Sequence, residues 1–276
     1  MGNNINDGYA DSNRFSDKAL LIYNDFLHSG KFLTHYKWLK NAAEDYDIKL
    51  ELMGNSECLC SYGTSFDNEL IETLGKYRFI LFWDKDIRLG KKFTNICKKI
   101  NIPIYNNIRA IADCDDKSAT YEKIGQWNDC HDTLEQIKMI PTIVAPMTYE
   151  NIGYTDMNFL DKVAEKFGFP LVIKECFGSF GMQVYMAHDM DELKKRVSDI
   201  GGKPMIFQKF IEKSSGFDVR LQVVGDEVVA AMYRYTDDGD FRANITHGGK
   251  MKSYEPDASE IKLATDTVKS LGLDFA

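Results

Sequence analysis

The 276-residue sequence lacks the features that mark several large classes of protein. No apolar run approaches the roughly 20 residues of a membrane-spanning helix, and the N-terminus lacks the basic-then-apolar order of a secretory signal. The chain also has fewer basic than acidic residues. Its 34 Lys and Arg and 42 Asp and Glu give a formal net charge of -8. Broad attraction to nucleic acid or to anionic membranes is therefore not expected, and the sequence predicts a cytoplasmic protein without either partner.

Cysteine is too sparse and too scattered for a disulfide framework, with six residues spread through a large chain. Cys58 and Cys60 form a close pair, but no second pair with zinc-finger spacing accompanies them. Cys176 lies beside a glycine-containing turn, where we favour a small apolar filler over an oxidation-sensitive thiol. The cysteine pattern thus indicates neither a secreted scaffold nor a structural zinc site.

Repeats, low-complexity blocks and long linkers are absent as well. Residues 1–16 are rich in Asn, Asp, Gly and Ser without periodicity, which predicts a mobile tail. Over residues 17–107, apolar strand patterns alternate with helical patterns, and this alternation predicts a parallel sheet with helices on its faces. The expected strands are 19–23, 48–53, 79–83 and 102–105, and the expected helices cover 32–43, 70–74 and 89–99.

Polar residues follow two of these strands, in the runs Tyr23-Asn24-Asp25 and Asp84-Lys85-Asp86. Ligands of open parallel sheets gather at the carboxyl ends of the strands, so both runs are candidates for contacting a substrate. The equal alternative is that these Asp and Asn residues cap the elements that follow them.

The most informative stretch is residues 169–187, FPLVIKECFGSFGMQVYMA. Lys174 follows an apolar strand that can aim its ammonium into a cleft, while Gly178, Ser179 and Gly181 let backbone N–H groups approach anionic oxygens. A returning strand follows the loop, which disfavours a Walker loop or a Rossmann fingerprint because both require a helix there. Taken alone, such a loop is more often an ordinary hairpin turn than a phosphate site.

The order of the motifs downstream strengthens the phosphate interpretation. Asp189 with Glu192 predicts a capping box that opens a helix, and an apolar strand follows at 204–211. A hairpin then turns at Gly225-Asp226, and a loop region contains the run GDFRAN at 239–244. His247-Gly248-Gly249 closes the series.

This order of motifs resembles the ATP-grasp ligases, and most closely the RimK-like branch, which modifies ribosomal protein S6 with glutamate. The resemblance covers roughly Asp116 to the C-terminus. It implies an α/β and α+β protein in which a parallel-sheet pre-ATP-grasp domain (17–107) precedes a two-subdomain ATP-grasp fold. The central subdomain would span 108–204, and the C-terminal subdomain, 205–276, would be incomplete.

The resemblance also implies a nucleotide site. Two lysines and the glycine loop would hold the phosphates. The main chain of Gln208, Lys209 and Ile211 would bind adenine, and Asp218 would lie near the ribose. The implied nucleotide-binding residues are Lys117, Lys174, Gly178, Ser179, Gly181, Gln208, Lys209, Phe210, Ile211, Asp218 and Arg220. Arg234, Arg242 and Asn244 would face the γ-phosphate and the acceptor carboxylate as the catalytic residues. Isolated arginines in such an acidic region are otherwise expected to pair with Asp237, Asp238 and Asp240.

The activity implied by the resemblance is an ATP-dependent carboxylate–amine ligase that forms an amide through an acyl phosphate, with an amino-acid or peptide substrate. The alternative is a non-catalytic nucleotide-binding protein of the same fold, acting as a sensor or scaffold. Mg²⁺ is the expected cofactor beside ATP, but the family's metal ligands would lie beyond Ala276, so none is expected within this chain. We favour a fragment of a longer protein over the loss of metal-supported catalysis, and a homo-oligomer remains possible.

Overall fold

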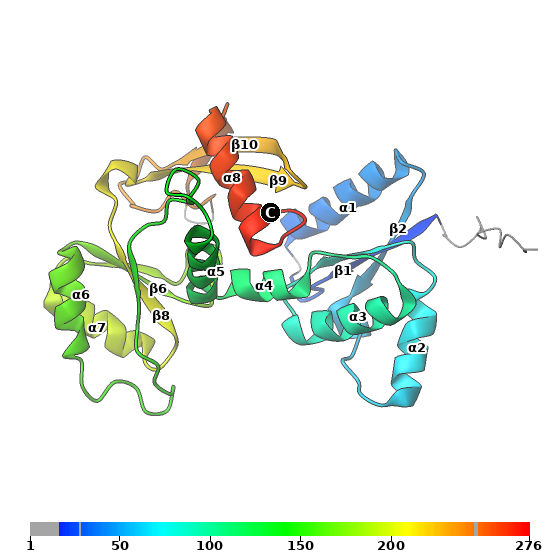
Figure 1. The fold of residues 1–276 in the computed structure, drawn as a ribbon, viewed down its shortest axis with the longest axis horizontal. Helices are drawn as coiled ribbons and strands as arrows, with labels where there is room; N and C mark the ends of the chain where they lie inside the picture. The colour runs from blue at the N-terminus through cyan, green and yellow to red at the C-terminus, as the bar shows by residue number, and fades with distance from the viewer. Residues whose placement is uncertain (1–16, 28, 246–247) are drawn as a thin grey trace, which may run out of the picture. The chain divides into compact units, whose positions relative to one another are not determined.

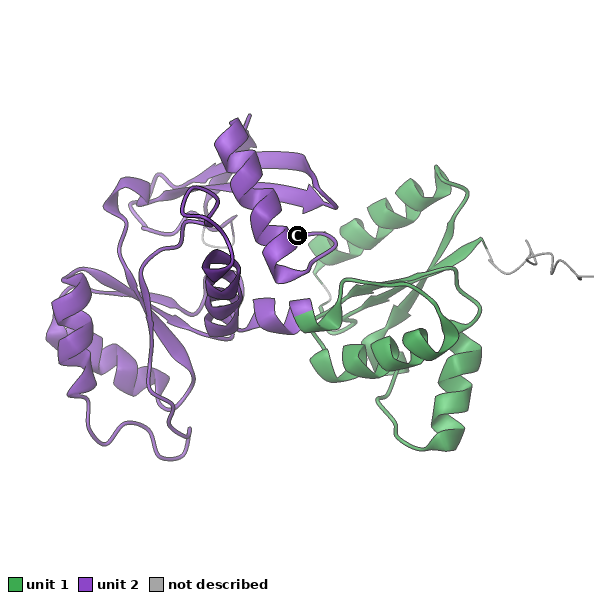
Figure 2. Ribbon diagram, viewed as in Figure 1, with its two compact units in different colours: residues 1–109 green, residues 110–276 purple. Residues whose placement is uncertain are grey.

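A computed structural model describes residues 17–27, 29–245 and 248–276. The predicted tail at 1–16 and His247 lie outside the described residues. The chain divides into two compact units, residues 1–109 and 110–276 (Figure 2). Among the helices of the described part, none is both long enough and apolar enough to cross a membrane.

The first unit is built on a four-stranded sheet in which every neighbouring pair is parallel, as the alternating sequence pattern predicts. The sheet order is β2-β1-β3-β4. Its strands are β1 (Lys18–Tyr23), β2 (Lys49–Gly54), β3 (Ile80–Trp83) and β4 (Ile104–Tyr105). Because the strands are parallel, their carboxyl ends lie at one edge of the sheet.

Helices cover both faces of this sheet (Figure 1). On one face Tyr36 packs with Ala19 and Leu21 of β1, and on the other the rings of Phe82 and Phe93 lie 6.3 Å apart at an edge-to-face angle. Three of the helices are α1 (Gly30–Glu44), α2 (Thr64–Leu74) and α3 (Ile87–Ile100). A short 3-10 helix (Asn55–Glu57) follows β2, and α4 (Ile108–Asp115) spans the boundary between the units.

The second unit contains a four-stranded antiparallel sheet in the order β5-β8-β6-β7. Its elements are β5 (Thr142–Val144), α6 (Phe159–Phe167), β6 (Leu171–Glu175), β7 (Val184–Ala187), α7 (Met190–Ile200) and β8 (Met205–Lys209). Leu171, Ile173 and Phe207 form a buried core with residues of α6 and α7. Since side chains alternate along a strand, Val172, Lys174 and Gln208 project from the opposite face.

A second antiparallel sheet, ordered β11-β10-β9, completes this unit. Its elements are β9 (Phe217–Val224), β10 (Glu227–Tyr235) and β11 (Lys250–Ser253), accompanied by α5 (Lys117–Asp129), the 3-10 helix Glu212–Ser214 and α8 (Ala258–Leu271). Asp257 and Glu260 form the capping box that opens α8, and Gly272 ends the helix in the left-handed region. Residues 274–276 pair with β9: Val223 N donates to Ala276 O at 2.7 Å, and Ala276 N donates to Val223 O at 2.9 Å.

Three local details differ from the sequence-based expectation. The spacing of apolar residues in the sequence predicts an amphipathic helix over 156–167, but the helix begins at Phe159, because the Asp156 carboxylate accepts from Asn158 N and holds a turn there. Asp189 caps α7 by accepting from Glu192 N, but Glu192 accepts from His188 N rather than from the cap residue, so the capping box is incomplete. The short strands β5 and β11 were not predicted, since neither has a clear apolar alternation.

Two glycines give a direct stability test of this packing. An added Cβ at buried Gly202, between α7 and β8, would lie 2.2 Å from Tyr149 O, which is a backbone atom that cannot simply rotate away. Gly202→Ala is expected to lower the free energy of unfolding by about 1–3 kcal/mol. Gly125→Ala, inside α5 with nothing within 4 Å, is expected to raise it by about 0.5–1 kcal/mol.

The free energies come from urea denaturation of the full chain, followed by circular dichroism. Equal effects of the two substitutions would contradict the close approach at Gly202.

Candidate functional site

Lys174 lies on β6, where its neighbours across the sheet are Ile206 of β8 and Val184 of β7. Its side chain lines a cavity of about 250 Å³ on the face of the sheet away from α6 and α7. The same cavity brings together many of the residues predicted for nucleotide binding and catalysis. They are Lys174, Gln208, Lys209, Phe210, Ile211, Asp218, Arg242 and Asn244.

Lys117 approaches the same region from the N-terminus of α5. Asp116 caps this helix by accepting from Ser118 N at 2.8 Å, and Lys117 is its first residue. The Lys117 ammonium donates to Cys176 O at 3.2 Å and to Gly178 O at 3.3 Å. Lys117 is therefore held against the loop after β6 rather than projecting as a solvated surface lysine.

The ammonium groups of Lys117 and Lys174 lie close enough to repel each other, and Lys174 is largely shielded from water. Burial lowers the pKa of the Lys174 ammonium, and the nearby charge of Lys117 lowers it further. A bound anion would raise the pKa of Lys174 again, because an opposite charge nearby stabilises the ammonium. This arrangement fits phosphate better than it fits an apolar ligand.

The loop between β6 and β7 carries Gly178, Ser179 and Gly181, and it touches the GDFRAN segment. Gly181 has a φ of 76°, and a Cβ there would lie 2.6 Å from Asn244 Oδ1. Arg242 Nη1 also donates to Gly181 O at 3.3 Å. Only glycine satisfies both the backbone angle and the close approach, so the two segments form one wall of the site.

The end of β8 carries the residues predicted to bind adenine. Gln208 is 2% exposed, and its amide nitrogen donates to Tyr121 Oη at 2.6 Å and to Thr142 Oγ1 at 2.8 Å. Lys209 N donates to Pro141 O at 3.1 Å, which ties the end of the strand to β5. Phe210 and Ile211 then leave the sheet and line the cavity.

The three arginines occupy different environments. Arg234 binds Asp218 in a bidentate manner, with Nε–Oδ1 at 2.6 Å and Nη2–Oδ2 at 2.7 Å. Arg220 lies near this pair: burial and the charge of Arg234 lower its pKa, while Asp218 opposes the shift. Arg242 pairs with Asp240, at 2.7 Å for Nη2–Oδ2, so the expected pairing with an acidic neighbour does occur at this arginine.

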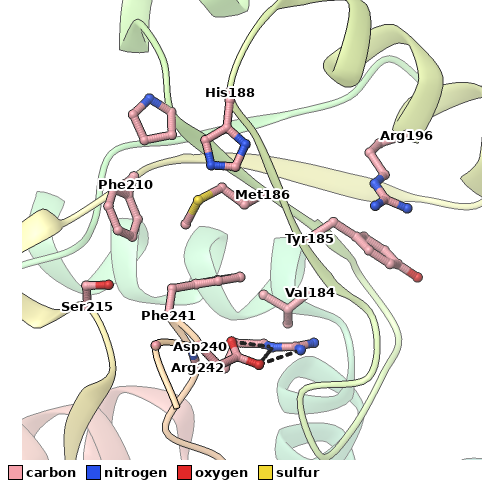
Figure 3. Close-up of a pocket in the computed structure, with 12 residues that line it drawn as sticks. Val184, Tyr185, Met186, His188, Arg196, Phe210, Ser215, Asp240, Phe241 and Arg242 are labelled. Carbon is pink, nitrogen blue, oxygen red and sulfur yellow. Dashed lines mark hydrogen bonds and ion pairs between the residues drawn. The ribbon is translucent and has the colours of Figure 1, made fainter. Parts of the chain in front are cut away.

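Arg242 also lines a larger neighbouring cavity of about 570 Å³, shown in Figure 3. Val184, Phe210, Phe241 and Arg242 line both cavities. The rings of Phe210 and Phe241 lie 6.4 Å apart at 81°, and Figure 3 shows Arg242 held by Asp240. These four side chains therefore stand between two compartments of one cleft.

In the first unit, the carboxyl edge of the parallel sheet collects a polar cluster. The Asp84 carboxylate accepts from Asn24 Nδ2 at 3.3 Å and from Asn55 Nδ2 at 3.1 Å, and burial raises its pKa. Capping occurs in both predicted runs, since Asn24 accepts from Phe26 N and Asp86 accepts from Leu89 N. Contact of these runs with a substrate stays a prediction.

The described residues do not by themselves fit a magnesium ion. No group of three or more His, Cys, Asp and Glu side chains in that part of the chain is arranged to hold a metal, and this includes Cys58 and Cys60. Asp218, which lines the cavity, and Asp240 beside it are each engaged by an arginine. Magnesium stays a prediction.

Sequence reasoning missed several residues that shape the site. Phe241 lies inside the quoted GDFRAN run, but its place between two cavities depends on Phe210, which is distant in sequence. Tyr121 and Thr142 hold Gln208 from elements 87 and 66 residues away. Nothing in a local pattern indicates such contacts.

Comparison with known proteins assigns the family. A model of the RimK-like ATP-grasp domain matches residues 128–276, which is more than half of the chain. The uncharacterized MG012 homolog of Mycoplasma pneumoniae is 28% identical over 266 residues, 92% of this chain and 84% of that protein. A probable alpha-L-glutamate ligase of Enterobacter sp. (strain 638) is 35% identical over 133 residues, 48% of this chain and 44% of the ligase.

The fold has solved counterparts as well. The D-alanine–D-alanine ligase of Bacillus anthracis superimposes with a TM-score of 0.60 at 17% identity, over 94% of this chain and 80% of that one. At this identity the likeness shows the fold alone, and it confirms the predicted combination of a parallel N-terminal sheet with antiparallel sheets. The chain belongs to the RimK-like ATP-grasp family.

Proposed function

We propose that this protein is an ATP-dependent carboxylate–amine ligase that joins amino-acid or peptide substrates through an acyl phosphate. The observation that carries the proposal is the cavity in which Lys174, the end of β8 and the GDFRAN segment meet. Membership of the RimK-like ATP-grasp family supports the reaction class. The glutamate ligases among its relatives support a glutamate-like substrate, although the chain spans less than half of the matched ligase.

The proposed reaction has two steps. A substrate carboxylate oxygen attacks the γ-phosphorus of ATP, so the bond from phosphorus to the β–γ bridging oxygen breaks and ADP leaves. An amine then attacks the acyl carbon, inorganic phosphate leaves and the nitrogen loses a proton. Neither step requires a nucleophile from the protein, since phosphoryl transfer depends mainly on positioning and on neutralising charge.

The residues predicted around the phosphates have distinct roles in this scheme. Lys117 and Lys174 bind phosphate oxygens as compact charges, and Gly178, Ser179 and Gly181 cover them with backbone N–H groups. The Arg242 fork binds the γ-phosphate or the acceptor carboxylate, assisted by Asn244. In this structure both oxygens of Asp218, which lines the cavity, are bound by the Arg234 guanidinium, so we assign Arg234 to positioning Asp218.

The reaction class is tested by measuring ADP release from ATP against a panel of carboxylate and amine pairs. We expect release to require both substrates at once, with glutamate-containing pairs among the active ones. ADP release without an amine would indicate a hydrolase, and ATP binding without turnover for any pair would favour the sensor or scaffold alternative.

The charge of Lys174 is tested by Lys174→Met, which keeps the length of the side chain and removes the ammonium. We expect ADP binding to weaken roughly 10- to 100-fold, the value of one hydrogen bond to a charged group. Lys195→Met is the matched control, because Lys195 is exposed on α7 and pairs only with Asp199 among the described residues. Calorimetric titration measures both, and equal affinities in the two variants would contradict a phosphate role for Lys174.

The pH dependence of stability offers an independent check on the same lysine. Folding lowers the pKa of Lys174 below its ordinary value of 10.5, so the charged form costs folding free energy at neutral pH. That cost is lost as the pH rises from the folded pKa toward 10.5, and this contribution to stability therefore rises in that window. Denaturation of the ligand-free protein at several pH values should show a smaller rise in Lys174→Met than in the wild type; an identical slope would contradict the burial.

A further inference from the structure

Among the described residues, β7 is the last strand at one edge of its sheet, and it borders the larger cavity of Figure 3. Its sequence, VYMA, lacks the charged residues and prolines that usually protect such an edge from pairing with another strand. Val184, Tyr185 and Met186 all line the cavity, although successive side chains of a strand point to opposite faces. The cavity therefore follows the free edge of β7, with residues 239–242 as its other wall.

The hydrogen-bond pattern shows which main-chain groups this edge offers. Glu175 N donates to Gln183 O at 3.1 Å, so these two residues form a hydrogen-bonded pair of the antiparallel ladder. Such pairs alternate with pairs whose N–H and C=O groups point away from each other. By the register of β6 and β7, Val184 and Met186 belong to the second kind. Their N–H and C=O groups point away from β6, and none of them has a hydrogen-bond partner within the described part of the chain.

One side of the larger cavity is apolar. Val184 shares a face of the sheet with Lys174, its neighbour on β6, and Met186 projects the same way two residues further on. Phe210 and Phe241 close the cavity on that side (Figure 3). An apolar side chain of a ligand would be shielded from water there.

The other side of the cavity carries positive charge. Tyr185 packs against the core that α6 and α7 share, and the guanidinium carbon of Arg196 lies 5.5 Å from the centre of its ring. Arg196 is exposed and forms no ion pair with any carboxylate that the structure describes. The other basic side chains that line the cavity have carboxylate partners, in the pairs Arg242–Asp240 and His188–Glu192. Since the chain has a net charge of -8, this arginine is a local exception that favours an acidic ligand.

We propose that the free edge of β7 binds an extended peptide segment as an additional strand, and that this segment carries an acidic residue between two apolar residues. Added strands gain affinity from main-chain hydrogen bonds and specificity from alternate side chains. A ligand residue opposite Tyr185 faces Arg196, which suits a carboxylate. Its two neighbours, opposite Val184 and Met186, face the apolar side of the cavity. The inference goes beyond the proposed reaction, because it concerns a polypeptide bound outside the nucleotide cavity.

The first test uses a short, capped, fluorescently labelled peptide with valine, glutamate and valine at its centre and glycine and serine on either side. Fluorescence anisotropy with the full chain should show binding that weakens roughly threefold or more when glutamine replaces the glutamate. Methylation of alternate backbone nitrogens blocks the N–H groups along one edge of an extended chain. Only one of the two alternating methylation patterns should abolish binding, since only one edge of an added strand faces β7.

The charge on α7 is tested by Arg196→Gln. This variant should bind the glutamate peptide roughly threefold or more weakly and the glutamine peptide as the wild type does. Lys195→Gln is the matched control, because Lys195 is the preceding residue of α7, pairs with Asp199 and does not line the cavity. Equal losses in the two variants would contradict a contact between the glutamate and Arg196.

The main-chain contact is tested by Met186→Pro, which removes an N–H that points away from β6 and so leaves the ladder between β6 and β7 intact. Peptide binding should weaken roughly tenfold or more, whereas Met186→Leu should preserve it. Met186 does not line the nucleotide cavity, so ADP affinity, measured by calorimetric titration, should stay within about threefold of the wild type. If Met186→Pro does not fold, the two methylation patterns decide the same point.

The possible failures are distinguishable. A protein that binds ADP but binds neither peptide, or binds the glutamate and glutamine peptides equally, would overturn this inference and leave the nucleotide site standing. A protein that binds the glutamate peptide but not ADP would do the reverse. Analytical ultracentrifugation covers a third outcome: a wild-type dimer that becomes monomeric in Met186→Pro would show that a second copy of the chain, rather than a peptide, occupies the edge.

Discussion

The register between β6 and β8 is the constraint on which the candidate site depends. Val172 lies opposite Gln208, and Lys174 lies opposite Ile206. Because side chains alternate along a strand, a slip of one residue would send Lys174 into the core and Ile173 into the cleft. Ile173 and Phe207 are both fully buried against α6 and α7, so the packing of one face fixes what the other face presents. The position of Lys174 is thus a consequence of apolar residues on the opposite face of the sheet.

Charge imposes a second constraint on the same face. Lys174 is half-buried near Lys117, and the Lys117 ammonium is held by the carbonyls of Cys176 and Gly178. Those carbonyls belong to the loop expected to cover the phosphates. The ammonium of Lys117 therefore hydrogen-bonds this loop and also adds positive charge where we expect an anion to bind.

Much of this arrangement could be predicted from the sequence, because it rests on local patterns. The lysine after an apolar run and the glycines of the following loop are encoded within a few residues of one another. The parallel sheet of the first unit likewise follows from strict alternation of elements. What could not be predicted depends on segments far apart in sequence. Thr142 meets Gln208 across 66 residues, and the short strand that carries Thr142 has no apolar alternation to reveal it.

Arg242 shows how a pairing that looks merely structural can serve binding. Its guanidinium gives Nε and Nη2 to Asp240 and Nη1 to Gly181 O, and the Asp240 carboxylate raises its pKa. A guanidinium has five N–H donors, and these contacts leave at least one on each terminal nitrogen. Asp240 therefore fixes the plane of the Arg242 guanidinium and leaves N–H groups available for another acceptor. A long, flexible arginine held this way loses less conformational freedom when an anion binds, so the pairing with Asp240 is compatible with the oxyanion role that we propose for Arg242.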